Sequence, residues 1–392
     1  MIDGWETVAL GDLLAQTNGL AYGIVQPGSH NLDGVPIVRV GDIARGVIDT
    51  TRPMKVAPEI DESHRRTRLR GGEVLLTIVG TVGRVAIVPA TLKDWNVARA
   101  VAVIRARDDE TAVWIKHVLG SPLLLQSMGI AQTDTVQATL NLRDVRLLRI
   151  PIPPLPELRR ISNLLESLEQ SIQTNIKIAT SSSELCNAIW QGLMIKINRY
   201  TSLNGVANVV LGGTPSRAQK EYWGGDIPWI NSGKVNEFRV IEASEMITEA
   251  GLLSSSTKMM PTGTTVIAIT GATLGQVSRL EIAACGNQSV IGVYADETAL
   301  NDYLFYYIKS KIDLLVQSAT GGAQQHINKT NVEELSVGLP SDADIREWHS
   351  TAAPLLATIA NSLFENQKLI RARDELLPLL LSGAIRVKEV AA

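Results

Sequence analysis

Few residues in this sequence have the types and spacing that chemistry requires. Gly233-Lys234 is the nearest approach to a phosphate-binding loop, but Val235 follows it where such a loop needs serine or threonine. The carboxylates of Asp108-Asp109-Glu110 lie between an expected strand and an expected helix, where helix capping explains them better than catalysis does. The five histidines show no metal-ligand spacing. We therefore expect no catalysis by this chain, and no metal or cofactor bound to it.

Motifs of enzymes that modify or cut DNA are absent from the sequence as well. The Pro153-Pro154 pair lacks the preceding Asn or Asp and the following aromatic residue that amino-group methyltransferases carry. No acidic residue has a lysine two positions later, as in many magnesium-dependent nucleases. A DNA-modifying enzyme with an unrecognised site stays open as an alternative, and tight binding of S-adenosylmethionine by the isolated chain would favour it.

A long internal repeat is the strongest pattern in the sequence. Residues 36–43 return as 228–235, 76–83 as 268–275 and 136–141 as 323–328, at offsets between 187 and 192. Repeats of solenoid proteins are much shorter, about 20–50 residues. The pattern therefore predicts two similar globular domains that alternate with two similar helices, with approximate twofold symmetry. Such a molecule suits a target made of two parts.

Strand signals dominate both expected domains. Two matched pairs of apolar, β-branched runs are found, 74–79 with 265–270 and 101–104 with 290–293. Helical patterns follow them over 111–128 and 300–317. Because strands and helices do not alternate regularly, each domain is expected to be α+β rather than a doubly wound sheet.

A proline-marked segment closes each domain, and a long helical pattern follows it. Proline disfavours helix in the residue before it, so these segments are stops after which a helix can begin. Apolar residues then recur at spacings of three and four, which is typical of a coiled-coil pair. About 38 residues at 1.5 Å each give a helix near 57 Å long. Polar interruptions such as Asn366 are expected to fix the register of the pair or to lie at its surface.

The chain is therefore expected to contain five parts in an α+β fold with pseudo-twofold symmetry. Two similar domains are separated by two long antiparallel coiled-coil helices, which act as a spacer. The expected parts are a first domain (1–154), a first helix (155–196), a second domain (197–340), a second helix (341–385) and a tail (386–392).

Composition limits the class of protein. Hydrophobic residues make up 45% of the chain and charged residues 20%, as in folded, soluble proteins. No apolar run reaches the roughly 18 residues that a membrane span needs, and the N-terminus lacks the features of a signal peptide. Cys186 and Cys285 are too few for a zinc site and are expected to be buried free thiols. These features predict a cytoplasmic protein.

The net charge of −3 argues mildly against nucleic-acid binding, but the charge is unevenly distributed. Residues 1–154 carry 17 basic and 16 acidic side chains, whereas residues 197–340 carry 10 and 13. The basic run Arg65–Arg70 is either a solvated face or a binding surface. A DNA-contacting protein this acidic is expected to share the duplex with a more basic partner.

Several stretches match one known family. They are Gly4-Trp5-Glu6, Gly212–Ser216, Tyr222–Ile230, Ala268–Gly275 and Leu380–Val387. In this order, and with the duplication, they make the chain resemble the specificity subunit of type I restriction–modification systems over essentially its full length.

The resemblance implies a non-catalytic, DNA-binding subunit with two target-recognition domains. Each domain would bind one half of a split double-stranded DNA sequence, and the helices would set the gap and dock two methylation subunits. Methyl transfer from S-adenosylmethionine, and cleavage driven by ATP with Mg²⁺, would belong to separate methylation and restriction subunits. No cofactor is expected in this chain itself.

Candidate DNA-binding residues follow from the chemistry of base recognition. Arginine pairs well with guanine, and Asn or Gln with adenine, when loops on a rigid sheet present them. In the first domain such residues are Thr81, Arg84, Asn96, Arg99, Gln137, Thr139, Asn141 and Arg143. In the second they are Thr273, Gln276, Asn287, Gln288, Gln324, Gln325, His326, Asn328 and Lys329. Asn141 and Asn328 are equally well explained as caps of the following turn.

Two other interpretations stay open. The chain could be a protein scaffold, or a solitary DNA-binding module without active enzyme partners. The long helices could also serve only to hold the two domains together.

Overall fold

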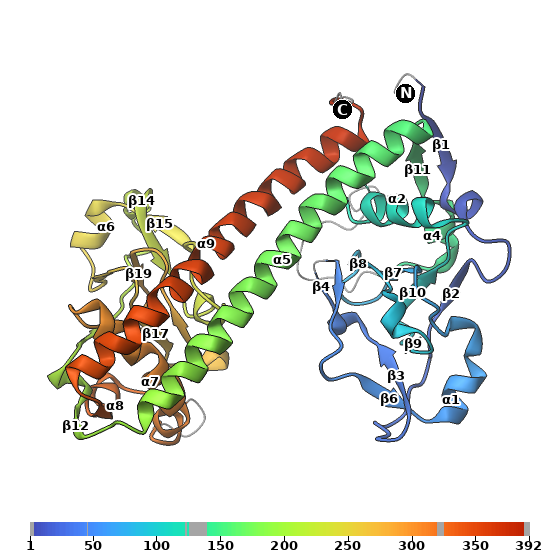
Figure 1. The fold of residues 1–392 in the computed structure, drawn as a ribbon. Coiled ribbons are helices and arrows are strands. Elements are labelled where there is room, and N and C mark those ends of the chain that lie inside the picture. The colour runs from blue at the N-terminus through green and yellow to red at the C-terminus, as the bar shows by residue number, and fades with distance from the viewer. Residues whose placement is uncertain (1–3, 45, 122–123, 125–138, 320–324, 388–392) are drawn as a thin grey trace. The chain divides into compact units, whose positions relative to one another are not determined.

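The computed structural model describes residues 4–44, 46–121, 124, 139–319 and 325–387. The chain forms two compact units, one made of Met1–Ser171 with Leu369–Ala392 and the other of Ile172–Lys368. We call them the first and the second unit. The long helices α5 (Leu155–Met194) and α9 (Asp342–Leu381) are each divided between the units (Figure 1). The domain boundaries expected from the sequence therefore remain an interpretation of chain order.

The first unit is built on a four-stranded antiparallel sheet with the order β2-β10-β7-β8. A second sheet, β6-β3-β9, packs against it through a buried cluster that includes Val38, Leu75 and Val103. The strands are β1 (Glu6–Ala9), β2 (Leu20–Tyr22), β3 (Val35–Val38), β4 (Ile43–Ala44), β5 (Val47–Ile48), β6 (Met54–Val56), β7 (Val74–Thr77), β8 (Val85–Ile87), β9 (Asn96–Val97), β10 (Val101–Ile104) and β11 (Arg149–Ile152). The short helices are α1 (Pro58–Ser63), α2 (Asp109–Leu119) and α4 (Leu142–Leu147).

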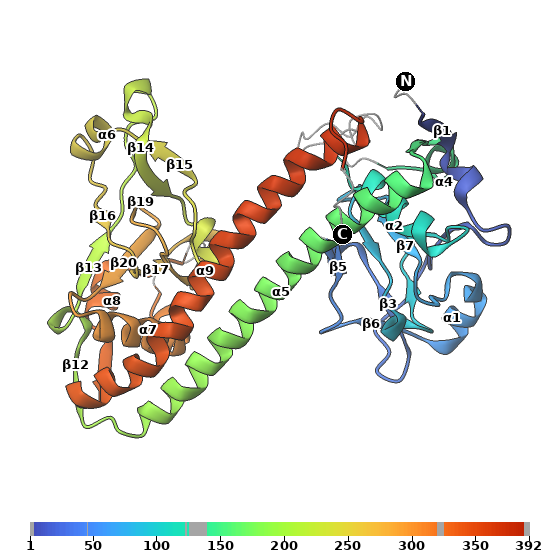
Figure 2. The same ribbon diagram turned by 45° about the horizontal axis from the view of Figure 1, so that its top comes forward.

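The second unit repeats this plan. Its antiparallel sheet has the order β13-β20-β17-β18, and the neighbouring sheet has the order β15-β14-β19-β16 (Figure 2). The strands are β12 (Arg199–Ser202), β13 (Asn208–Leu211), β14 (Trp223–Ile230), β15 (Glu245–Ile247), β16 (Met259–Met260), β17 (Thr265–Ala268), β18 (Val277–Arg279), β19 (Ala284–Gly286), β20 (Val290–Tyr294) and β21 (Ser336–Leu339). The short helices are α6 (Glu249–Leu253), α7 (Thr298–Gln317) and α8 (Lys329–Glu333).

The duplication predicted from the sequence is confirmed by the topology. In both units the strand that opens the domain pairs with the proline-marked strand, as β1 with β11 and as β12 with β21. In both units a parallel strand pair, β3 with β9 or β14 with β19, lies beside the antiparallel sheet. Both domains are therefore α+β, as expected.

The strand predictions from apolar runs are confirmed, and one helix prediction needs correction. The expected strands at 74–79 and 265–270 appear as β7 and β17, with every residue buried. Within the helix expected over 111–128, α2 ends at Leu119, where Gly120 caps it with a hydrogen bond to Lys116 O, and residues 122–123 and 125–128 lie outside the described residues. At its start, Asp108 accepts a hydrogen bond from the Thr111 N–H at 2.7 Å, which confirms the capping interpretation of that acidic run.

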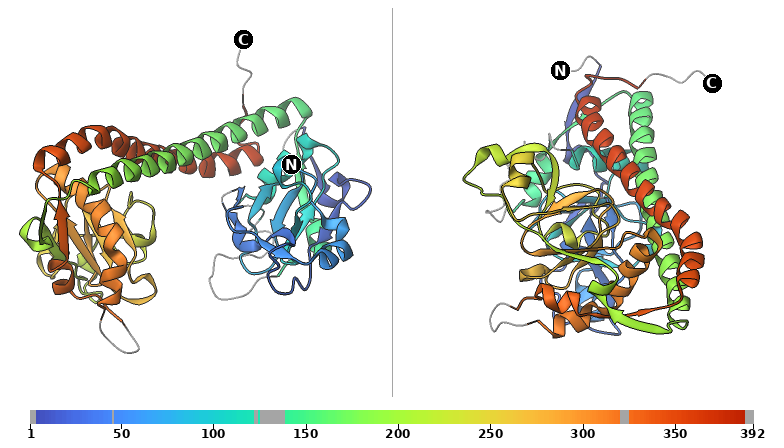
Figure 3. Two further views of the ribbon diagram at one scale, coloured as in Figure 1. Left: turned by 60° about the horizontal axis from the view of Figure 1, so that its bottom comes forward. Right: turned by 90° about the vertical axis from the view of Figure 1, so that its left-hand side faces the viewer.

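Segments of the two long helices run antiparallel within the second unit, as Figure 3 shows. Asn366 Nδ2 donates to Ile172 O at 3.1 Å, and Cys186 lies against Ala352, so the numbering rises along one helix as it falls along the other. Asn366 is only 5% exposed. Because the Nδ2 bond to Ile172 O can form in one register only, Asn366 fixes the alignment of the two segments.

Candidate nucleic-acid interface

Three segments of the first unit meet at one end of the β2-β10-β7-β8 sheet, where β7 ends and β10 begins. Ile78, just after β7, donates its N–H to Ala100 O at 2.9 Å, and its own carbonyl accepts from Leu140 N at 2.9 Å. Val79 and Thr139 then form an isolated β-bridge. These bonds bring together the glycine turn after β7, the segment between β9 and β10, and the loop before the proline-marked strand.

The second unit contains the same convergence. Ile269 donates to Ser289 O and accepts from Ile327 N, each at 3.0 Å, and Thr270 forms a bridge with His326. Candidates predicted from the sequence lie on all three segments, and these segments come together in both units.

A fourth segment, which was not predicted from the sequence, reaches the same end of the sheet in each unit. Ala98 N donates to Val38 O, and Asn287 N donates to Ile230 O, both at 2.9 Å. Arg39 therefore follows β3 at the edge, as Asn231 follows β14. The repeat of residues 36–43 at 228–235 was the signal that could have pointed to it. We call the four segments of each unit its loop edge: 39–42, 78–84, 97–100 and 139–143 in the first, and 231–234, 269–276, 286–289 and 325–329 in the second.

Glycine is required where another strand crosses each loop edge. A Cβ on Gly23 would lie 2.2 Å from Val97 O, and a Cβ on Gly212 would lie 2.2 Å from Asn287 O. No side chain fits at such a distance, so both glycines allow the backbones to approach closely. The matched pair shows that the two edges share one backbone design.

In the first unit most candidates are available at the surface. Thr81, Arg99, Thr139 and Arg143 are exposed, whereas Arg84 is half-buried and donates from Nη1 to Ile43 O at 3.0 Å. Gln137 lies outside the described residues.

Asn96 must be removed from the candidates. Its side chain is fully buried, and its Nδ2 donates to Asp61 Oδ1 at 2.7 Å. Its Oδ1 accepts from Thr67 Oγ1 at 2.8 Å and from its own neighbour Val97 N at 2.9 Å. An amide with both ends bonded inside the protein cannot reach a base, so Asn96 organises the loop edge from within.

In the second unit the exposed candidates are Gln276, Gln288, Gln325 and His326. Thr273, Asn287, Asn328 and Lys329 are half-buried, and Gln324 lies outside the described residues. Asn287 Oδ1 accepts from Ser289 N at 3.0 Å, and Lys329 pairs with Glu333 at 3.1 Å. These two side chains are engaged within the unit.

Asn141 and Asn328 are helix caps. Asn141 Oδ1 accepts from Asp144 N at 2.9 Å at the start of α4, and Asn328 Oδ1 accepts from Asn331 N at 2.8 Å at the start of α8. The capping alternative is thus confirmed for both residues, and their role at the loop edge is to hold the following turn.

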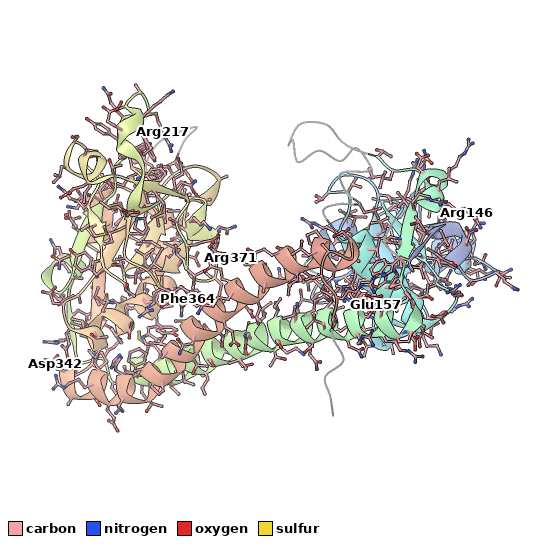
Figure 4. All side chains as sticks on the ribbon, turned by 90° about the horizontal axis from the view of Figure 1, so that it is seen from above. Arg146, Glu157, Arg217, Asp342, Phe364 and Arg371 are labelled. Atoms are coloured by element: carbon pink, nitrogen blue, oxygen red, sulfur yellow. The ribbon has the colours of Figure 1, made fainter. Side chains whose placement is uncertain are left out.

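Arg217, on the segment before β14 in the second unit, is a further arginine that the sequence analysis did not single out (Figure 4). Its guanidinium stacks 3.6 Å from the Trp223 ring centroid and forms a two-point ion pair with Glu245 at 2.6 and 2.7 Å. The same carboxylate raises the pKa of Arg217. Because its donors are engaged, we treat it as a support of this segment.

Part of the basic run Arg65–Arg70 in the first unit forms ion pairs with neighbouring carboxylates. Arg68 pairs with Asp61 and Glu62, and Arg65 lies 3.8 Å from Glu62. These contacts favour a structural role for half of the run. Among the described residues no group of three His, Cys, Asp or Glu side chains could hold a metal ion, and no helix is long and apolar enough to cross a membrane.

Comparison with known proteins places the chain in a family. The family model described as the type I restriction modification DNA specificity domain matches residues 2–180 and 198–349. The EcoBI specificity subunit of Escherichia coli is 30% identical over 198 residues, which cover 50% of this chain and 42% of that protein. This chain therefore spans less than half the length of that relative.

Two further likenesses extend over nearly the whole chain. The putative MjaX specificity subunit of Methanocaldococcus jannaschii is 22% identical and covers 98% of this chain and 95% of its own length. The S subunit structure from M. genitalium shares the fold, with a TM-score of 0.58 at 14% identity and coverage of 98% and 97%. With the family model matching twice along it, this chain belongs to the family of type I restriction–modification DNA specificity proteins.

Proposed function

We propose that this chain recognises double-stranded DNA without catalysing a reaction, and that each domain binds one half of a bipartite sequence. The observation that carries the proposal is the loop edge, which is built twice on the same backbone plan with exposed arginine or amide side chains. Such side chains on a rigid sheet suit base recognition in the major groove. The family to which the chain belongs supports the same assignment.

Partner subunits are the second part of the proposal. A net charge of −3 supplies little neutralisation of phosphates, so a more basic partner has to contribute it. Ile178 and Leu185 are 40% and 50% exposed and lie seven residues apart, hence on one face of α5. We propose that methylation subunits, two per chain, dock on the long helices. They and restriction subunits would bring S-adenosylmethionine, ATP and Mg²⁺ to the complex, in the cytoplasm where the DNA lies.

Selection from a random DNA pool tests the proposal. The purified chain, mixed with candidate methylation subunits, should enrich a split sequence with a fixed gap. Removing seven residues from both long helices should change the gap and leave the half-site sequences unchanged. Absence of any enriched sequence would contradict DNA recognition. Tight, sequence-specific binding by the chain alone, or a complex with a single methylation subunit, would contradict the role given to the partners.

A further inference from the structure

Backbone hydrogen bonds identify which residues of the two loop edges are equivalent. Thr77 N donates to Arg84 O, and Ala268 N donates to Gln276 O, both at 2.9 Å across the same strand pair. Arg84 and Gln276 thus hold the same position in the two domains.

A second pair of equivalent residues lies on the segments after β9 and β19. Ala98 and Asn287 make the equivalent bonds to the strands β3 and β14. The residues that follow them, Arg99 and Gln288, are therefore equivalent. Both are exposed, and both stand one residue beyond that bond.

A third position follows directly from the ends of β3 and β14. Arg39 comes after Val38, and Asn231 comes after Ile230, at the two carbonyls that accept the bonds just described. At all three positions the first domain has arginine and the second has an amide.

These two side-chain types differ in the base that they bind best. The guanidinium of arginine donates two parallel hydrogen bonds to O6 and N7 of guanine, whereas the amide of Asn or Gln donates to N7 and accepts from N6 of adenine. We propose that at the equivalent positions of the two loop edges the first domain reads guanine and the second reads adenine. The proposal rests on the DNA recognition argued above and adds the chemical identity of each half-site.

The pair Arg99 and Gln288 carries the proposal furthest. Within the described part of the chain, the Arg99 side chain has no hydrogen bond or ion pair. All of its guanidinium N–H groups are therefore available to a base. Gln288 Oε1 accepts from Thr214 Oγ1 through one lone pair, and its second lone pair and its NH₂ group remain for N6 and N7 of adenine.

The other two pairs are more constrained. Arg84 donates one guanidinium N–H to Ile43 O and has its other N–H groups available, while Gln276 is exposed. Arg39 is held by Asp42 through Nε at 3.0 Å and Nη2 at 2.8 Å, and Asn231 Oδ1 accepts from Gly233 N at 2.9 Å. We therefore expect the effect to decrease from the Arg99 position to the Arg84 position and then to the Arg39 position.

An exchange of the two side chains tests the proposal. The full chain in complex with its methylation subunits would be used to select DNA with both half-sites randomised, for the unchanged protein, Arg99→Gln and Gln288→Arg. Arg99→Gln should reduce discrimination for one guanine of the first half-site about 10- to 100-fold, and should leave the second half-site unchanged. Gln288→Arg should shift one position of the second half-site from adenine toward guanine.

Lys93→Gln is the matched control, because it removes one positive charge from an exposed residue that follows the turn Ala90–Leu92 and belongs to none of the four segments of the loop edge. It should leave both half-sites unchanged. A uniform loss of affinity for all sequences with Arg99→Gln would show a phosphate contact and overturn the proposal, as would a first half-site without guanine in the unchanged protein. Failure of the unchanged protein to select any sequence would instead contradict the proposed function. Arg84→Gln and Gln276→Arg provide the same measurement at the second position.

Discussion

In the first unit the domain contacts helix α5 through charged side chains, whereas in the second unit the equivalent positions are aromatic and apolar. Lys116 and His117 of α2 are 9% and 4% exposed. The Lys116 ammonium forms ion pairs with Glu166 and Glu169 of α5, and His117 Nε2 lies 3.0 Å from Glu166 Oε1. This contact is an ionic joint between domain and helix.

Hydrogen bonds to the proline-marked strands align the two domain helices for the comparison. Trp114 Nε1 of α2 donates to Pro151 O at 2.7 Å, and Tyr303 OH of α7 donates to Gly338 O at 2.6 Å. Trp114 and Tyr303 are thus equivalent, and the residues two and three positions later can be compared directly.

Those residues are Phe305 and Tyr306 in the second unit, in place of Lys116 and His117. Both aromatic side chains are buried in one cluster with Leu356 of α9, and Tyr306 packs edge-on against Trp348 with centroids 6.0 Å apart. Where the first unit has an ionic joint, the second has an aromatic one.

The ionic contact of the second unit lies at a different position. Asp302 accepts from Arg279 Nη2 at 2.8 Å and lies 3.0 Å from His349 Nε2 of α9. The equivalent residues of the first unit are Val113 and Ser162, which carry no charge. The comparison shows that the repeated backbone fixes where a domain meets its helix, while the side chains at each joint fit only their own partner face. If either domain packed on the helix face that the other domain uses, a charged side chain would be buried without a partner of opposite charge. Such burial lowers the stability of the fold.

Among the substitutions that test this comparison, Asp302→Ala should reduce stability the most. The change removes one of the two carboxylates on the buried Arg279, whose Nη1 still bonds Glu281 at 2.6 Å, and the carboxylate beside His349, so unfolding of the second unit should become easier by about 3 kcal/mol. Urea unfolding followed by tryptophan fluorescence measures this. Val113→Ala at the equivalent position is the control and should cost about 1 kcal/mol or less. Equal effects of the two substitutions would mean that the joints do not differ as described.

Converting the first joint to the chemistry of the second should have the next largest effect. Glu166→Ala with Glu169→Leu leaves the buried Lys116 ammonium without a carboxylate and removes the contact of His117, and should lower stability by about 2–3 kcal/mol. Adding Lys116→Phe and His117→Tyr should recover at least about half of that loss. A thermodynamic cycle over the four proteins gives the coupling. Simple additivity of the two double substitutions would exclude a matched joint.

Acid should weaken the first joint by a smaller amount. Hydrogen bonding from His117, opposed by burial and reinforced by Lys116, lowers the pKa of the Glu166 carboxyl to about 2. A carboxyl with a depressed pKa contributes stability that is complete above its unfolded pKa and is lost as the pH falls toward the folded value. The window therefore runs from about pH 4.5 down to about pH 2. Because Glu166 is 43% exposed, solvent screening limits the effect to about 1–2 kcal/mol. Glu166→Gln should remove this component, and an unchanged acid response in that variant would rule it out.

Patterns of local origin were predictable from the sequence, and contacts of tertiary origin were not. The buried strand at 74–79, the cap at Asp108 and the two long helices follow from composition and spacing within a few residues. Nothing local marks Asn96 as buried, because its partner Asp61 lies 35 residues away. The charged joint was equally hidden, since Lys116 and Glu166 read separately as ordinary helix-surface residues.

The helix caps should give the smallest effects, and the two units should respond alike to their loss. Asn141→Ala and Asn328→Ala each remove a side-chain acceptor from the first turn of a short helix, which costs about 1 kcal/mol. Ser at either position keeps an uncharged acceptor and should restore most of the stability lost in the Ala variant, which separates capping from general disruption. Since the asparagine Oδ1 accepts from the third residue of the helix at similar distances in both units, 2.9 and 2.8 Å, thermal unfolding should shift by similar amounts. In DNA selection each Ala substitution should broaden one half-site only, because the cap positions the loop edge of its own domain. A stability loss confined to one unit's variant would show that the two edges differ in backbone as well as in side chains. That outcome would remove the basis for comparing them position by position.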